Sequence, residues 1–266
     1  MAAFAADIPQ SLTGRTRVSD DGYAGRLGSS IPTSVTPRGT GGSVAPARNA
    51  SRVRDVLERL RLEDTVVCPD GSAHDLFPVA IPAAEGEALR KYVIHEGASQ
   101  TLEVGLGYAV STLYICDGLI QSGHGGAMHV AVDPYQFSRF ANCGLQLLAE
   151  AGAGELVEHH LEPSQTALPR FLNEGRVFDL AFVDGDHRFD GVFVDLFYAG
   201  RLVRPGGVVM LDDHQLPAIE RAASFFRNNL GWTVEELSPP DAHHQWIVMR
   251  TSQLLDRHPF DFFVDF

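Results

Sequence analysis

The stretch 178–214 constrains the fold of this chain more than any other part of the sequence. It contains two short apolar runs typical of buried strands, 180–183 and 208–211. Between them lie a helix-length segment at 192–202 and an Arg-Pro-Gly-Gly turn. Two strands connected through one helix form a right-handed βαβ unit, so the strands run parallel and both carboxyl ends open at the same edge of the sheet.

Acidic residues follow both of these strands. Asp184 comes directly after the first strand, and Asp212 and Asp213 come directly after the second. Since ligands of α/β sheets bind at the carboxyl ends of the strands, we expect these three side chains to converge. Their hard oxygen ligands suit Mg²⁺ or a similar cation. The alternative is that each aspartate caps a helix, but three carboxylates beside His187 and His214 favour a functional site.

The whole chain alternates between strand and helix patterns. Expected strands lie at 101–105, 129–133, 155–160, 180–183 and 208–211, expected helices at 110–119, 137–151, 192–202 and 218–230, and a terminal hairpin at 232–237 and 244–250. This alternation predicts an α/β fold with a doubly wound, Rossmann-like, mostly parallel seven-stranded sheet. The sheet ends in a C-terminal antiparallel hairpin and is preceded by an N-terminal helical extension.

We expect four segments along the chain, at 1–48, 49–100, 101–250 and 251–266. The first lacks a sustained apolar period, which predicts a flexible arm or a lid over the active site. The second holds two amphipathic helices that flank the cleft, 83–93 and an earlier one capped by Asn49 or Ser51. The third is the main domain. The aromatic tail covers an edge of the core or contacts a second subunit in a homo-oligomer.

Composition excludes several classes of partner. The formal net charge of −13 argues against nucleic acid or an anionic membrane, because like charges repel. No apolar run reaches the ~20 residues that span a bilayer, and the first residues lack the pattern of a secretory signal. The three cysteines are scattered, so we expect buried thiols in a cytoplasmic protein. The adjacent pairs at 159–160 and 243–244 place histidines on opposite strand faces, which predicts structural or surface roles.

A glycine loop follows the strand 101–105. Gly105 and Gly107 allow a tight turn, and Ser111 lies in the first turn of the next helix, whose free N–H groups attract a ligand. A dinucleotide site requires a third glycine where this chain has Val110. Asp133 ends the next strand, where an acidic side chain accepts both hydroxyls of a ribose or caps a turn. The two signals favour a nucleoside without a diphosphate.

The motifs LEVGLG (102–107), VAVD (130–133), FVDGDHRFDGVFVDL (182–196) and LVRPGGVVMLDD (202–213) resemble those of class I S-adenosylmethionine-dependent methyltransferases. The resemblance covers about residues 80–250. More narrowly, the chain is similar to the metal-dependent small-molecule O-methyltransferases, both the catechol and caffeoyl-CoA types and the branch that tailors macrolide and cephem antibiotics.

This resemblance implies roles for matching positions. Glu103, Gly105 and Gly107 would line the methionine part of S-adenosylmethionine, and Asp133 would hold its ribose. Ser164 and Gln165 would border the adenine. Together with Ser111 and Asp184 these residues make up the expected cofactor site.

The resemblance also implies a metal site and a base. Asp184, Asp212 and Asp213 match the Mg²⁺ ligands, although the third is usually Asn in the catechol type. His187 stands where that type has a catalytic lysine, and a neutral imidazole is a competent base near pH 7. His214 is the second candidate, as a base or as a residue that orients Asp213.

We therefore expect methyl transfer to a hydroxyl of a small sugar, catechol-like or natural-product acceptor, assisted by Mg²⁺ and with His187 as general base. Three alternatives stay open at this point. One is a metal-independent methyltransferase of the same fold, one is an NAD-dependent oxidoreductase, and one is a non-catalytic nucleoside-binding scaffold. The concentration of charge at Asp184, His187 and Asp212 argues against a pure binding protein.

Overall fold

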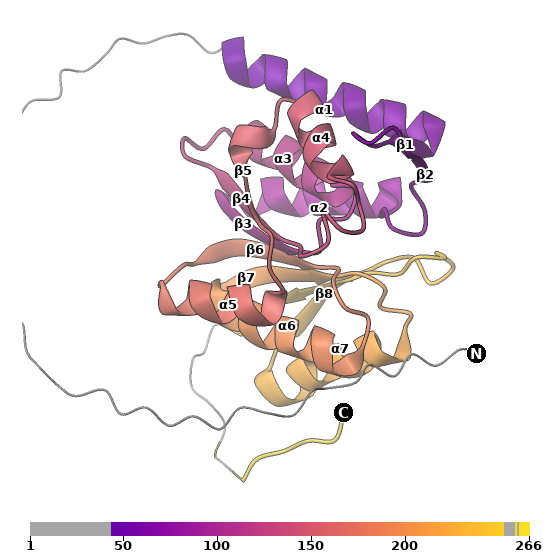
Figure 1. Ribbon diagram of the computed structural model, residues 1–266. Coiled ribbons are helices and arrows are strands. Elements are labelled where there is room, and N and C mark those ends of the chain that lie inside the picture. The colour runs from indigo at the N-terminus through magenta and orange to yellow at the C-terminus, as the bar shows by residue number, and fades with distance from the viewer. Residues whose placement is uncertain (1–43, 253–258, 260) are drawn as a thin grey trace, which may run out of the picture. The chain divides into compact units, whose positions relative to one another are not determined.

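A computed structural model describes residues 44–252, 259 and 261–266. The predicted arm, apart from its last five residues, lies outside the described part of the chain. The seven-stranded sheet has the order β5-β4-β3-β6-β7-β9-β8 (Figure 1). Its strands are β3 (Gln100–Val104), β4 (Met128–Val132), β5 (Val157–His160), β6 (Phe178–Val183), β7 (Val203–Leu211), β8 (Thr233–Leu237) and β9 (Ile247–Arg250).

The predicted sheet topology is confirmed. Strands β3 to β7 pair in parallel, including the β6–β7 pair expected from the βαβ pattern, while β9 runs antiparallel to both β7 and β8. The order reverses direction between β3 and β6, because the chain moves outward from β3 to β5 and then returns. Ligands of open α/β sheets bind at such a switch point, beyond the carboxyl ends of the strands.

Helices cover both faces of the sheet (Figure 1). They are α1 (Val44–Glu63), α2 (Ala83–His95), α3 (Val110–Ser122), α4 (Cys143–Glu150), α5 (Ser164–Asn173), α6 (Phe189–Leu202) and α7 (Pro217–Leu230), with a 3₁₀ turn at Gly154–Leu156 before β5. The buried apolar residues form two clusters, one under α1 to α4 and one under α5 to α7. This is the doubly wound arrangement, with apolar side chains of the sheet divided between two cores.

The N-terminal extension packs on α3. Val53, Val56, Leu57 and Leu60 are buried along one side of α1, and Leu89 and Val93 along one side of α2. A short hairpin that the sequence did not reveal, β1 (Thr65–Val67) with β2 (Ala73–Asp75), connects the two helices. No helix of the described residues is long and apolar enough to cross a bilayer.

Two predictions about the N-terminal helix are wrong. Asn49 and Ser51 do not cap it, because α1 already begins at Val44 and so crosses the predicted boundary at 48. The segment before Asn49 contains Ala45 and Ala47, which favour a helix, and Pro46, which the first turn of a helix tolerates.

The helix expected at 137–151 is also shorter than predicted. α4 covers only Cys143–Glu150, and a series of turns precedes it. Ala141 and Asn142 adopt positive φ values of 47° and 59°, which no α-helix accommodates. At Gly144 an added Cβ would lie 2.7 Å from the carbonyl oxygen of Gly107. The turns therefore bring the start of α4 against the glycine loop.

The Arg-Pro-Gly-Gly segment does not form a separate turn before β7. It lies within β7, where the pairing with β6 jumps from Phe178–Val203 to Leu180–Val208, so residues 204–207 bulge opposite Asp179. The Asp179 carboxylate accepts hydrogen bonds from Arg204 Nε (3.2 Å) and from the backbone N–H of Ser99 (2.8 Å). This bulge lies at the amino end of β7, whereas Asp212 follows its carboxyl end.

The end of the chain packs on α7. Asn229 donates from its side-chain nitrogen to the carbonyl of Val264 and accepts from the Val264 N–H, at 2.8 and 2.7 Å. The ring of Phe266 lies 5.0 Å from that of Phe225 and 6.4 Å from that of Phe189. The tail thus covers apolar side chains of α6 and α7, while contact with a second subunit stays a prediction.

Candidate active site

The glycine loop is held by close backbone packing. Gly105 has a φ of 98°, and a Cβ at this position would lie 2.0 Å from the carbonyl oxygen of Asp184. Only glycine fits both the backbone angle and the space. The loop after β3 therefore lies directly against the loop after β6, which places the expected cofactor residues beside the expected metal ligands.

Asp133 bonds to the glycine loop. Its carboxylate accepts from the backbone N–H groups of Leu106 (3.1 Å) and Gly107 (2.9 Å), and its other oxygen accepts from the N–H of Tyr135 (2.6 Å). These contacts agree with the alternative role considered for Asp133, that of capping a turn. Binding of a ribose by Asp133 stays a prediction. Among the described residues its Oδ1 accepts one hydrogen bond, from the Tyr135 N–H, so this oxygen keeps a lone pair for a hydroxyl.

Glu103 lies in a buried polar network on β3. Its Oε2 accepts from the Thr112 hydroxyl at 2.5 Å and lies 3.1 Å from His129 Nε2, while His129 Nδ1 lies 2.9 Å from the Thr101 hydroxyl. Oε1 of Glu103 is buried without a hydrogen-bond partner among the described residues. Ser111, in the first turn of α3, is buried beside this network.

The expected adenine residues begin α5. Ser164 is half-buried, and Gln165 is exposed. The Ser164 hydroxyl hydrogen-bonds to Asp195 of α6, a buried carboxylate. Burial raises the pKa of Asp195 to about 6, and the Ser164 hydrogen bond opposes this rise. α5 and α6 are thus linked by a polar contact.

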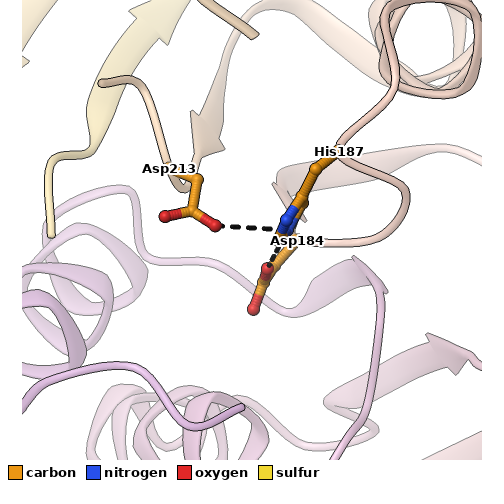
Figure 2. A group of neighbouring side chains, drawn as sticks. All are labelled: Asp184, His187 and Asp213. Carbon is orange, nitrogen blue, oxygen red and sulfur yellow. Dashed lines mark ion pairs between the residues drawn. The ribbon is translucent and has the colours of Figure 1, made fainter. Parts of the chain in front are cut away.

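The three side chains Asp184, His187 and Asp213 meet at the carboxyl ends of β6 and β7 (Figure 2). His187 Nε2 lies 3.5 Å from Asp184 Oδ1 and 3.2 Å from Asp213 Oδ2. Asp184 and Asp213 therefore converge as predicted, whereas Asp212 groups with Asp213 and His244 instead of with Asp184. The Asp184 hydrogen bond raises the pKa of His187 above its usual range, while burial opposes that rise.

Asp212 and Asp213 also lie close to His244. The Asp212 carboxylate accepts from the N–H of Asp213 at 2.6 Å, and His244 Nδ1 lies 3.7 Å from Asp213 Oδ1. Asp213 has a φ of 53°, an uncommon backbone conformation for a residue other than glycine. Strained backbone of this kind clusters at functional sites, where the surrounding structure holds it in place.

These residues form two groups whose ligand atoms lie close enough together to hold a cation. One ligand atom from each of Asp184, His187 and Asp213 lies within 4.8 Å of the others, and so does one from each of Asp212, Asp213 and His244. Burial and the charge of Asp212 raise the pKa of Asp184 to about 8, although its bond to His187 lowers it. Carboxylates that repel one another in this way gain from a bound positive charge.

His214 is not part of this cluster. Burial lowers its pKa, and the charged groups that act on it are Glu220 and Arg227 of α7. Its Nε2 is buried without a hydrogen-bond partner in the described part of the chain. The sequence placed His214 beside Asp213, but the left-handed backbone of Asp213 turns the chain at this point, and the His214 N–H donates to Gln245 at 2.7 Å.

Two site residues were missed by sequence reasoning. His244 was interpreted as a structural or surface residue because its adjacent pair with His243 forms no metal motif. Glu85, in the first turn of α2, is fully buried, and its charged neighbours are Asp212, Asp184 and Asp213. A signal for Glu85 existed, since it precedes the inward-facing Leu89 by four residues and therefore lies on the same side of the helix.

Comparisons with known proteins agree with this architecture. Residues 102–214 match the model of a methyltransferase domain family. A protein of Mycolicibacterium vanbaalenii named "Putative O-methyltransferase" is 30% identical over 178 residues, which cover 65% of this chain and 73% of that protein.

Two solved structures share the fold. An O-methyltransferase from Bacillus cereus in complex with SAH covers 76% of this chain and 91% of its own, with a TM-score of 0.60 and 18% identity. The O-methyltransferase TomG from Streptomyces achromogenes, solved with SAM, covers 76% of this chain and 89% of its own, with a TM-score of 0.57 and 22% identity.

The family excludes the oxidoreductase and scaffold alternatives that the sequence left open. The glycine loop with Val110 instead of a third glycine is consistent with a nucleoside cofactor that has no diphosphate. The chain belongs to the class I S-adenosylmethionine-dependent O-methyltransferases.

Proposed function

We propose that this enzyme methylates one of two neighbouring hydroxyls on a small molecule such as a catechol or a sugar, and that a divalent cation, Mg²⁺ in the first place, assists. One observation carries the proposal. His187 Nε2 lies between the carboxylates of Asp184 and Asp213, at 3.5 and 3.2 Å, beside the glycine loop. A base, an anionic site and the expected cofactor site thus adjoin one another.

The residues fit a divalent cation. Asp184, Asp212 and Asp213 offer hard oxygen ligands at two adjacent strand ends, and their mutual repulsion is relieved by a bound cation. When bound there, a cation supplies Lewis-acid chemistry that lowers the pKa of an acceptor hydroxyl. The preference for two neighbouring hydroxyls follows, since two oxygens chelate one cation better than one does.

His187 is proposed to take the proton of the acceptor hydroxyl. Asp184 and Asp213 orient its imidazole, and a half-exposed ring leaves room for the acceptor. The methyl group of a sulfonium is already activated, so the main task of the protein is to align the acceptor oxygen with the S–CH₃ bond. The residues of the glycine loop and α5 would hold S-adenosylmethionine in that orientation.

A second candidate is metal-independent methyl transfer. It is favoured by the position of His187 itself, because a protonated imidazole between Asp184 and Asp213 neutralises the same carboxylates that a cation would bind. In that case the acidic residues would position the acceptor, and the neutral form of the histidine would take the hydroxyl proton without a metal.

Measuring turnover with and without metal distinguishes the metal-assisted reaction from the metal-independent one. Methyl-labelled S-adenosylmethionine is incubated with catechols and sugar diols in Mg²⁺ or in EDTA, and label in the product is counted. We expect EDTA to reduce the rate at least about 100-fold and Mg²⁺ to restore it. An equal rate in EDTA would establish the metal-independent reaction. TomG is described as involved in tomaymycin synthesis, so natural-product phenols and sugars belong in the acceptor panel.

A further inference from the structure

Glu85 is a buried acid that the proposed reaction does not yet use. It lies in the first turn of α2, its exposed fraction is 0%, and neither carboxylate oxygen has a hydrogen-bond donor among the described residues. The carboxylate of Asp212 lies within hydrogen-bonding reach of it. Two carboxylates form a hydrogen bond only if one of them carries a proton.

The surroundings of Glu85 are unfavourable for a carboxylate in every respect. Burial and the charges of Asp212, Asp184 and Asp213 raise its pKa to about 11. A core position of this shape would be filled at lower cost by Gln or Leu, because an isolated buried charge is expensive. The position becomes favourable once a positive charge lies among these four carboxylates.

The packing of α2 fixes Glu85 in this place. At the next residue, Gly86, an added Cβ would lie 2.2 Å from the ring of Tyr114, so the absence of a side chain lets α2 pack closely on α3. Leu89, one turn further along α2, is fully buried. With the helix held against α3, the Glu85 side chain is fully buried and lies within hydrogen-bonding reach of Asp212.

We propose that Glu85 supplies a fourth carboxylate to the cation site, so that the N-terminal extension closes the site formed by Asp184, Asp212 and Asp213. The inference rests on the cation of the proposed function. According to this inference, α2 takes part in metal binding together with the residues at the strand ends. A site with four carboxylates suits Mn²⁺ or Ca²⁺ as well as Mg²⁺, because these ions accept protein oxygen ligands with less regular geometry.

Calorimetric titration of MnCl₂ into the full chain tests this directly. The variants are Glu85→Gln, which keeps the shape and removes the charge, and Glu87→Gln as the matched control. Glu87 lies on the same helix, but half of its side chain is exposed and it pairs with Arg90. We expect Glu85→Gln to weaken Mn²⁺ binding by about 10- to 100-fold and Glu87→Gln to change it less than about twofold.

Thermal unfolding gives an independent readout. Without metal, Glu85→Gln should unfold at a higher temperature than the wild type, because a buried unpaired acid is gone, and Mn²⁺ should raise its Tm less than it raises that of the wild type. Glu85→Asp keeps the charge but shortens the side chain. It should also weaken Mn²⁺ binding, which covers the case in which the glutamine variant folds poorly.

The outcomes distinguish this inference from the proposed function. If the wild type binds Mn²⁺ and Glu85→Gln binds it within twofold, the role of Glu85 is wrong and the three-aspartate site stands. If the wild type binds no Mn²⁺, both the fourth ligand and the cation of the proposed function are overturned. Weaker binding in both Glu85 variants, with the Glu87 control unchanged, supports the proposal.

Discussion

The glycine-loop region and the acidic region lie against each other, yet their carboxylates differ in the hydrogen-bond donors that they have. The glycine-loop region comprises Glu103, the loop 105–109 and Asp133. Asp133 accepts three backbone N–H groups, and Glu103 accepts a threonine hydroxyl. The acidic region comprises Glu85, Asp184, His187, Asp212 and Asp213. Among the described residues, Glu85 has no hydrogen-bond donor and Asp212 accepts one backbone N–H, that of Asp213. Burial raises the pKa values of Glu85, Asp184 and Asp212.

The difference indicates which region is complete before a ligand arrives. A carboxylate that accepts backbone N–H groups is stable as an anion and organises the loop that donates them. Carboxylates without such donors leave a negative charge that a cation or protonated histidines must balance. We infer that the glycine-loop region is preorganised for the cofactor, whereas the acidic region is completed by binding.

The largest expected effect comes from His187→Gln, which removes the base and keeps a polar side chain. We expect turnover to fall by about 10²- to 10⁴-fold, the usual contribution of general base catalysis, with S-adenosylmethionine affinity unchanged. In the wild type, the Asp184 hydrogen bond raises the pKa of His187 above 6.5, so turnover should increase as pH rises through that raised value. Initial rates between pH 5 and pH 9 check both points. A variant with the wild-type pH profile would exclude His187 as the base.

Gly105→Ala should mainly affect the glycine-loop region. The added methyl group would lie 2.0 Å from a backbone oxygen at a φ of 98°, so the two loops must separate. We expect S-adenosylmethionine affinity to fall at least about 100-fold and stability to fall by about 1 to 3 kcal/mol. Gly125→Ala is the control, because no atom lies within 4 Å of its added Cβ. Calorimetry and thermal unfolding measure the two effects, and equal behaviour of both variants would refute the packing argument.

A smaller effect, on folding stability, is expected for Asp195→Asn. This variant tests the cost of burying a carboxyl group that lies outside the acidic region. Burial raises the pKa of the Asp195 carboxyl from 3.8 to about 6 in the folded protein. The folded state therefore loses stability as pH rises from about 4 to 6, and the loss stays constant above that range. Asparagine does not ionise, so the variant should be more stable than the wild type at pH 8, by at most about 3 kcal/mol, and similar to it at pH 4. Urea unfolding at the two pH values checks this, and a stability difference independent of pH would contradict it.

The sequence predicted those features of the structure that depend on the pattern of neighbouring residues. The strands, their parallel order and the convergence of Asp184 with Asp213 follow from the apolar periodicity and the handedness of βαβ units. The early start of α1 follows from the local helix propensity of residues 45–47, which the prediction overlooked. The left-handed residues before α4 and the bulge in β7 depend instead on tertiary packing, which a short stretch of sequence does not reveal. Helical periodicity places Glu85 on the inward side of α2, but only tertiary packing brings α2, and the segment before β9 that holds His244, to the strand ends.

The most direct test of the comparison is a pair of calorimetric titrations on the wild type and Asp212→Asn. S-adenosylmethionine is titrated first into metal-free protein, and Mg²⁺ is then titrated into the cofactor-loaded protein. We predict that S-adenosylmethionine binds both proteins with similar affinity, and that Mg²⁺ binds only the wild type measurably. If S-adenosylmethionine failed to bind without Mg²⁺, or if Asp212→Asn bound Mg²⁺ like the wild type, the division into a preorganised cofactor region and a cation-completed acidic region would be contradicted.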